Sequence, residues 1–132
     1  TRKAVYARQL EIVSLLHREG VHFLAGTDLA NPYIYPGFSL HDELASLVAA
    51  GFTPAEALRA ATLDPARYLG AADSLGSIEP GKRADLVLLS ANPLDDIRNT
   101  TKLVAVVAAG RLYDSAAIAK LLADGVARAG VP

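Results

Sequence analysis

The sequence contains no cysteine, no methionine and no tryptophan among its 132 residues. The absence of cysteine excludes disulfide bonds, thiolate metal sites and a cysteine nucleophile, and it is typical of proteins in a reducing compartment such as the cytoplasm. A net charge of −1 leaves no basic surface to neutralise phosphates, so we expect no nucleic-acid partner. No apolar run approaches the roughly 18 residues that cross a bilayer, and nothing resembles a signal peptide, so we expect no membrane partner.

The missing methionine extends to position 1, and a helical pattern is already under way within the first ten residues. We therefore expect these 132 residues to be a fragment of a longer protein. Removal of an initiator methionine, or cleavage of a tag, is the alternative explanation. With 52% hydrophobic and 20% charged residues, the chain is expected to be globular and to bury one modest core.

The first half of the sequence predicts helices interrupted by one strand. Gly20 is expected to end the first helix, Ser39 to be the N-cap of the second, and Thr53 with Glu56 to form a capping box. Between the first two helices, Asn-Pro and Pro-Gly pairs indicate a loop. The predicted helices lie at residues 4–19, 39–50, 53–61 and 64–69, and the predicted strand is VHFLAGTD at residues 21–28.

From about residue 70 the pattern changes from helix to strand. Two short strands are expected on either side of the turn at residues 79–82, the second being ADLVLL. The stretch KLVAVVAAGRLYD predicts a hairpin whose strands meet at Ala109 and Gly110. An alanine-rich helix is expected at residues 115–128.

Asp28 is the first candidate for chemistry. A carboxylate just past the C-terminal end of a parallel strand lies where α/β barrels place their active sites. An ionised aspartate there is able to bind a divalent metal ion and to accept a proton from metal-bound water. The alternative is that Asp28 caps the following turn, and its position alone favours this simpler role.

The histidines are the next candidates. His41, in the first turn of the helix after the Asp28 loop, is placed to point back toward Asp28, whereas His17 is expected on the solvated surface and His22 partly buried in a sheet. No two histidines have the H-x-H or H-x-x-x-H spacing that builds a metal site locally. Because a catalytic metal site needs about three protein ligands, the chain does not supply a complete one.

Three stretches of the sequence resemble the C-terminal part of the metal-dependent amidohydrolase superfamily. They are GTD at residues 26–28, SLHDELASLVAAGFTPAEALRAATLDPARYLG and LGSIEPGKRADLVLLSANPLDDI, and they are close to imidazolonepropionase-like and Xaa-Pro dipeptidase-like members. The resemblance implies an α/β fold in three parts. Residues 1–70 would be the last helix–strand–helix units of a TIM barrel, residues 71–114 strands of a small composite β-sandwich, and residues 115–132 a C-terminal helix. In the sandwich, Gly81, Lys82 and Asp85 are interpreted as structural.

The same resemblance implies metal-dependent hydrolysis of carbon–nitrogen bonds in a small-molecule substrate of the cyclic amide, amide or dipeptide type. Asp28 matches the family's aspartate, which binds the divalent metal, expected to be zinc, and takes a proton as metal-bound hydroxide attacks. Tyr33 and His41 are expected substrate contacts.

The family's H-x-H motif, its carboxylated lysine or glutamate and its two later histidines are absent. We therefore expect the chain alone to be inactive, and to pair with the missing barrel half or with itself. The alternative is a noncatalytic, self-associating module derived from the same fold.

Overall fold

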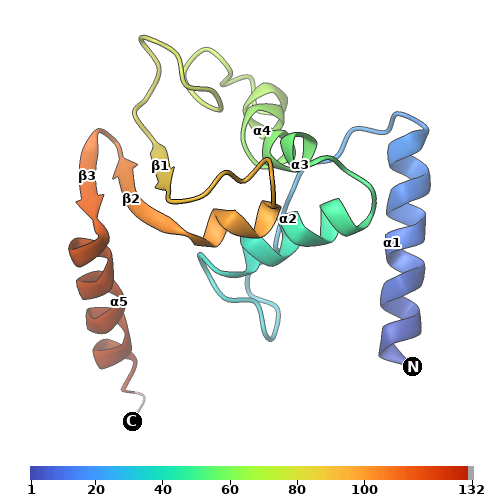
Figure 1. Cartoon of the computed structure of the whole chain (residues 1–132), viewed down its shortest axis with the longest axis horizontal. Coiled ribbons are helices and arrows are strands. Elements are labelled where there is room, and N and C mark those ends of the chain that lie inside the picture. The colour runs from blue at the N-terminus through green and yellow to red at the C-terminus, as the bar shows by residue number, and fades with distance from the viewer. Residues whose placement is uncertain (131–132) are drawn as a thin grey trace.

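The structure is a computed structural model that describes residues 1–130. The chain has a mixed α/β fold. Along the sequence, four helices come before a small antiparallel sheet, and one helix follows it. Figure 1 shows α1 and α5 at opposite ends of the molecule, with α2, α3, α4 and the sheet between them. The elements in chain order are α1 (Arg2–Arg18), α2 (Ser39–Ala49), α3 (Pro54–Ala60), α4 (Leu63–Tyr68), β1 (Leu86–Leu89), the 3-10 helix η1 (Ile97–Thr101), β2 (Leu103–Ala108), β3 (Arg111–Asp114) and α5 (Ser115–Ala129). None of the helices within residues 1–130 combines the length and apolarity needed to span a bilayer.

The end of α1 confirms the predicted glycine stop. Gly20 has φ +80°, a conformation that only glycine adopts without strain. The Gly20 N–H donates to the His17 carbonyl, and the Val21 N–H donates to the Leu16 carbonyl, both at 3.0 Å. These two bonds satisfy carbonyls that the last helical turn leaves free, which ends the helix at the position that the sequence indicated.

The start of α3 confirms the predicted capping box. The Glu56 N–H donates to the Thr53 hydroxyl oxygen at 3.2 Å, and the Thr53 N–H donates to the Glu56 carboxylate at 2.7 Å. The prediction for Ser39 is right about where α2 begins but wrong about the cap. Phe38 is the N-cap residue, and Ser39 is the first helical residue. Its hydroxyl instead accepts a hydrogen bond from the Tyr35 N–H at 2.9 Å, because the chain turns tightly before the helix.

The sheet is antiparallel, with the strand order β1-β2-β3. The hairpin between β2 and β3 turns at Ala109 and Gly110, as predicted. Of the two strands predicted on either side of the turn at residues 79–82, the second is confirmed as β1. The first is wrong, because the described residues 71–85 contain turns and bends and no strand. Gly76 explains this path, since its backbone lies directly against the start of α4.

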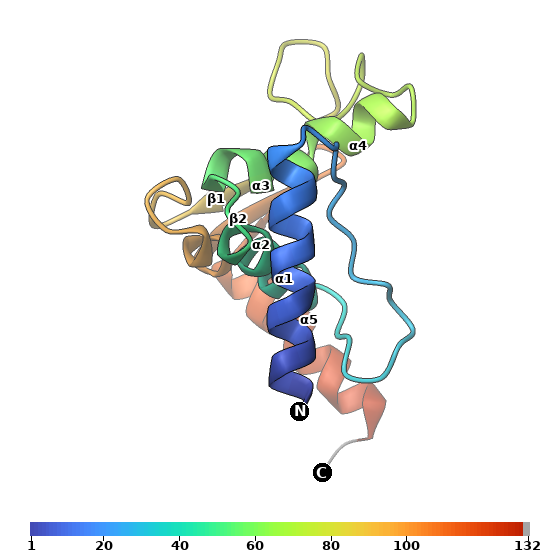
Figure 2. The same cartoon turned by 90° about the vertical axis from the view of Figure 1, so that its right-hand side faces the viewer.

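The strand predicted at residues 21–28 is wrong. These residues contain no strand, and their one backbone hydrogen bond to a distant segment runs from the Ala25 N–H to the Ala60 carbonyl at 2.8 Å. Their burial still alternates, because Phe23, Ala25 and Thr27 are half-buried whereas the residues between them are exposed. Figure 2 shows this segment as an extended chain without helix or strand. A strand is defined by its pairing with a neighbouring strand, and no strand of the described residues pairs with this segment.

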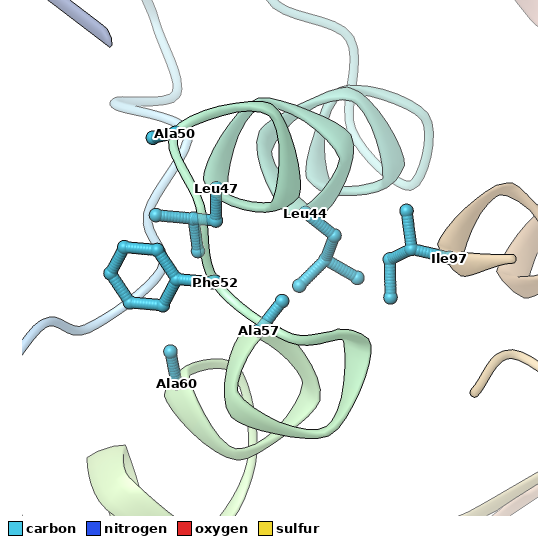
Figure 3. Packing of buried hydrophobic residues seen from close by; sticks show 7 residues of the cluster. All are labelled: Leu44, Leu47, Ala50, Phe52, Ala57, Ala60 and Ile97. Carbon is cyan, nitrogen blue, oxygen red and sulfur yellow. The ribbon is translucent and has the colours of Figure 1, made fainter. Parts of the chain in front are cut away.

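The core lies between α2 and α3, where side chains from three elements meet (Figure 3). Leu44 and Leu47 of α2 face the alanines of α3, and Ile97 of η1 closes one side. The other side is closed by Phe52, whose ring meets the Phe23 ring edge-on with 5.4 Å between centroids. This small cluster fixes the helices relative to the segment that leads to Asp28.

Candidate functional site

Asp28 lies at the start of an exposed loop, directly after the half-buried residues of the 21–28 segment. It has φ +51°, and its neighbour Asn31 holds it through several contacts. The Asn31 side-chain amide donates to the Asp28 carboxylate, and also to the Asp28 carbonyl oxygen at 3.2 Å. The Asn31 backbone N–H donates to the same carbonyl at 3.3 Å. Asp28 therefore takes part in the turn, as the simpler of its two predicted roles requires, and one carboxylate oxygen is left available.

The loop that follows Asp28 carries an unusual concentration of left-handed backbone. Four non-glycine residues of the described chain have positive φ, and three of them lie within six positions: Asp28 (+51°), Ala30 (+94°) and Tyr33 (+69°). Each such residue costs about 1–3 kcal/mol and persists only where its surroundings hold it. Strain of this kind is often found at functional sites, and here it surrounds the predicted catalytic aspartate.

Tyr33 is the most exposed large apolar side chain of this loop, with 86% of its surface accessible to solvent. It does not line the small cavity of about 420 Å³ beneath the loop, to which Thr27, Leu29, Tyr35 and His41 contribute. The structure therefore brings His41 close to the residues on either side of Asp28, whereas Tyr33 stands apart from them.

His41 is fixed by a residue that sequence reasoning missed. Its Nδ1 lies 3.0 Å from the hydroxyl oxygen of Thr100, which is buried in η1. The Thr100 hydroxyl donates its one hydrogen to the Ile97 carbonyl at 2.8 Å, so His41 Nδ1–H must be the donor in the first contact. No sequence signal links these residues, because 59 positions separate them.

The two remaining histidines differ from their predictions. His17 is half-buried rather than solvated, because its ring stacks on Phe52 with 3.7 Å between centroids. His22 is exposed rather than partly buried, because residues 21–28 join no sheet. His17 Nε2 also lies 3.6 Å from the Glu56 carboxylate. Hydrogen bonds from the Thr53 N–H and hydroxyl lower the pKa of Glu56, and the His17 ring lowers it further. These contacts stabilise the helix packing and lie outside the Asp28 loop.

The residues present do not form a complete metal site. Within residues 1–130, no three histidine, cysteine, aspartate or glutamate side chains are grouped so that they could hold a metal ion. Asp28 offers one carboxylate, whereas a catalytic zinc site uses about three protein ligands. The chain by itself therefore does not fit the metal that its resemblance implies.

A larger groove of about 990 Å³ lies between the helices and β1. Its lining includes Leu44, Leu86, Arg83 and Asp85, so its walls are mainly apolar with an ion pair at one edge, where Arg83 and Asp85 approach to 2.8 Å. Asp85 also accepts a hydrogen bond from the Ala109 N–H at 2.6 Å, which ties β1 to the β2–β3 hairpin. The structural interpretation of Asp85 is therefore confirmed.

Comparison with known proteins covers most of the chain. The sequence profile of the amidohydrolase family matches residues 4–113. The imidazolonepropionase of Pseudomonas putida strain GB-1 is 42% identical over 80 residues, which are 60% of this chain and 20% of that protein. The N-acetylgalactosamine-6-phosphate deacetylase of Escherichia coli O157:H7 is 56% identical over 41 residues, or 31% and 11% of the two chains.

Among solved structures, a Xaa-Pro dipeptidase with bound methionine in its active site superimposes with a TM-score of 0.72 at 30% identity, over 80% of this chain and 25% of that one. An amidohydrolase from Thermotoga maritima MSB8 gives a TM-score of 0.60 at 29% identity, over 80% and 26% of the two chains. The chain thus spans between 11% and 26% of the length of these relatives. Since the family profile matches well over half of its residues, the chain belongs to the amidohydrolase family.

Proposed function

We propose that this chain is the C-terminal part of a metal-dependent hydrolase that cleaves carbon–nitrogen bonds in small molecules. In that protein, residues 1–70 would complete a TIM barrel, residues 71–114 would join a β-sandwich, and α5 would be the helix of the segment predicted at residues 115–132, of which residues 131–132 lie outside the described residues. The observation that carries the proposal is the position of Asp28. It follows a segment of alternating burial within the family match, as an aspartate at the end of a barrel strand would.

The role proposed for Asp28 is that of one metal ligand and of the base that accepts a proton from the attacking water. A carboxylate held in place by an amide, as Asn31 holds this one, keeps its orientation while its other oxygen stays available. The remaining ligands would come from residues outside this chain, because the described residues hold no further cluster. We propose zinc as the metal and the cytoplasm as the location.

The accessible surface supports a partner for this chain. It measures 9659 Å², whereas a compact monomer of 13.8 kDa exposes about 6,600 Å². The excess, about 3,000 Å² on this one chain, is more than each partner of a typical obligate interface buries, about 1,000–2,500 Å². The open 21–28 segment and the exposed apolar side chains of α1 belong to this surface. The proposed partner is the remaining part of the barrel.

Two measurements test the proposal. The purified chain, saturated with zinc and given amide and cyclic-amide substrates, should show no turnover, and clear turnover would refute the claim that its site is incomplete. In the longer protein, Asp28→Asn should lower kcat by about 10²–10⁴-fold, as loss of a general base does. Asp42→Asn is the matched control, because Asp42 is an exposed aspartate in the first turn of α2. Equal effects of the two substitutions would contradict the role of Asp28.

The second candidate is a noncatalytic module that associates with itself, and the same excess surface favours it. Sedimentation of the chain separates the two proposals. A discrete dimer that buries the excess surface, with no longer reading frame upstream, would support the module. An H-x-H motif encoded upstream of Thr1 would support the hydrolase.

A further inference from the structure

Thr100 is the only polar residue that is buried among residues 1–130, with 7% of its surface exposed. Its hydroxyl donates to the Ile97 carbonyl at 2.8 Å and accepts a hydrogen bond from His41 Nδ1 at 3.0 Å. Turning the hydroxyl away would leave the half-buried His41 N–H without an acceptor, which is costly. Figure 3 shows Ile97 of the same 3-10 helix facing Leu44 of α2. The helices η1 and α2 are therefore joined by a polar contact as well as an apolar one.

The helix η1 is itself held in place by its neighbours. The Asp96 carboxylate caps its start by accepting a hydrogen bond from the Arg98 N–H at 2.9 Å. The Asn99 side-chain amide donates to the Asn92 carbonyl at 2.8 Å, and β2 begins two residues after η1 ends. Thr100 is thus presented to His41 from a restrained segment that belongs to the part of the chain with the sheet.

The loop between Asp28 and α2 is a series of hydrogen-bonded turns that leads from His41 back to Asp28. The His41 N–H donates to the Phe38 carbonyl at 3.0 Å, and the Phe38 N–H donates to the Tyr35 carbonyl at 3.1 Å. The residue before Tyr35 donates its N–H to the Asn31 carbonyl at 3.3 Å. The Asn31 side-chain amide in turn donates to the Asp28 carboxylate. Because contiguous hydrogen bonds carry coupling between distant groups, a displacement of His41 should reach the side chain that holds Asp28.

The segment on the other side of Asp28 has a separate anchor. The Ala25 N–H donates to the Ala60 carbonyl of α3 at 2.8 Å, three residues before Asp28. Between this anchor and His41, three non-glycine residues keep a left-handed backbone, which relaxes where nothing restrains it. Loss of either anchor should therefore let the loop and its Asn31 side chain move.

We propose that His41 is a positioning residue, which Thr100 holds so that the start of α2, the loop before it and the Asp28 carboxylate keep one arrangement. This inference rests on the proposed function, in which Asp28 is the base. It gives the part of the chain that contains the sheet a task at the candidate site, because η1 lies 59 positions from His41 and does not supply a ligand. The role requires the His41 ring to reach Thr100 and does not require it to touch the substrate.

The test is NMR spectroscopy of the ¹⁵N-labelled 132-residue chain and its Thr100→Val variant. The ring of His41 should show a proton on Nδ1 in the unchanged chain and lose that signature in the variant, since the partner of a ring nitrogen decides where the proton sits. The resonance of the Asn31 side-chain amide should shift. The Phe38 N–H should exchange with solvent about threefold to tenfold faster, which corresponds to the loss of one hydrogen bond.

Two variants of the same helix are the controls. Thr100→Ser keeps the hydroxyl and should restore all three readouts. Thr101→Val should leave them unchanged, because the Thr101 hydroxyl donates to the Arg98 carbonyl at 2.8 Å just as the Thr100 hydroxyl donates to Ile97, but it is exposed and has no contact with His41.

A second pair of variants removes the other partner, in case Thr100→Val does not fold. His41→Leu has no donor and should reproduce the shift of the Asn31 amide, whereas His41→Asn keeps an N–H donor near the place of Nδ1 and should reduce that shift. The inference is overturned if Thr100→Val and His41→Leu leave the Asn31 amide unmoved, if Thr101→Val moves it as much, or if Thr100→Ser does not restore it. These measurements need neither metal nor turnover, so their failure is distinct from failure of the Asp28→Asn test.

Discussion

Gly76 is the position where the structure makes its sharpest prediction about stability. It has φ +87°, and a Cβ atom added there would lie 2.7 Å from the Ala66 Cβ, 2.9 Å from the Leu63 Cα and 2.9 Å from the Thr62 carbonyl oxygen. Two of these atoms belong to the backbone of α4 and its N-cap, which do not move aside as a flexible side chain would. Gly76→Ala should therefore force the 71–85 segment away from α4.

The size of the effect follows from three contributions. A left-handed alanine costs about 1–2 kcal/mol, and overpacking against a fixed neighbour costs about 1–3 kcal/mol. The alanine also restricts the unfolded chain, which stabilises the fold by about 0.4–1 kcal/mol. The net loss for Gly76→Ala is then about 1–4.6 kcal/mol in the free energy of unfolding.

Gly81→Ala is the matched control. Gly81 has nearly the same backbone, with φ +88°, but a Cβ there would meet no atom within 4 Å. The control therefore contains the conformational and entropic contributions without the overpacking, and it should be less destabilising than Gly76→Ala by about 1–3 kcal/mol.

Urea unfolding followed by circular dichroism measures both variants, with the midpoint compared at an unchanged slope. If Gly81→Ala loses as much stability as Gly76→Ala, then the close approach to α4 has no energetic consequence and the reasoning is wrong. If both lose nothing, the left-handed conformation of both turns is wrong as well.

Two further predictions concern the helical part. Glu56 has a lowered pKa in the folded state, so its contribution to stability is present above its unfolded pKa of about 4.3 and is lost as the pH falls through the folded value. Glu56→Gln should therefore destabilise the chain at pH 7 and reduce the loss of stability on acidification below about pH 5, both measured by thermal unfolding across pH. Thr100→Val should cost about 1–3 kcal/mol in urea unfolding, because it leaves the half-buried His41 N–H without its acceptor. Thr101→Val is the control, since the exposed Thr101 hydroxyl donates only to the Arg98 carbonyl, and equal losses would contradict the role of the His41 contact.

Much of the helical structure was readable from the sequence because helix ends are decided locally. The stop at Gly20 and the capping box of Thr53 and Glu56 each involve residues within a few positions of one another, so the pattern alone specifies them. The hairpin at Ala109 and Gly110 is local for the same reason. Family membership was also readable, because long contiguous stretches carry it.

Only the tertiary structure decided the features that depend on distant segments. Residues 21–28 have the alternation of a strand, but a strand exists only when another strand supplies hydrogen-bond partners, and none of the described residues does so. His17 is half-buried because its ring stacks on the Phe52 ring. His41 is held by a hydrogen bond to Thr100, which lies 59 positions further along the chain.

The candidate site follows the same division. The sequence by itself determined that Asp28 ends an apolar segment and begins a loop without charge. The structure decided that Asn31 holds it, that the loop is strained, and that no group of three possible metal ligands forms around it among residues 1–130. Caps and turns form within a few residues of chain, whereas a metal site needs side chains that folding collects from several segments.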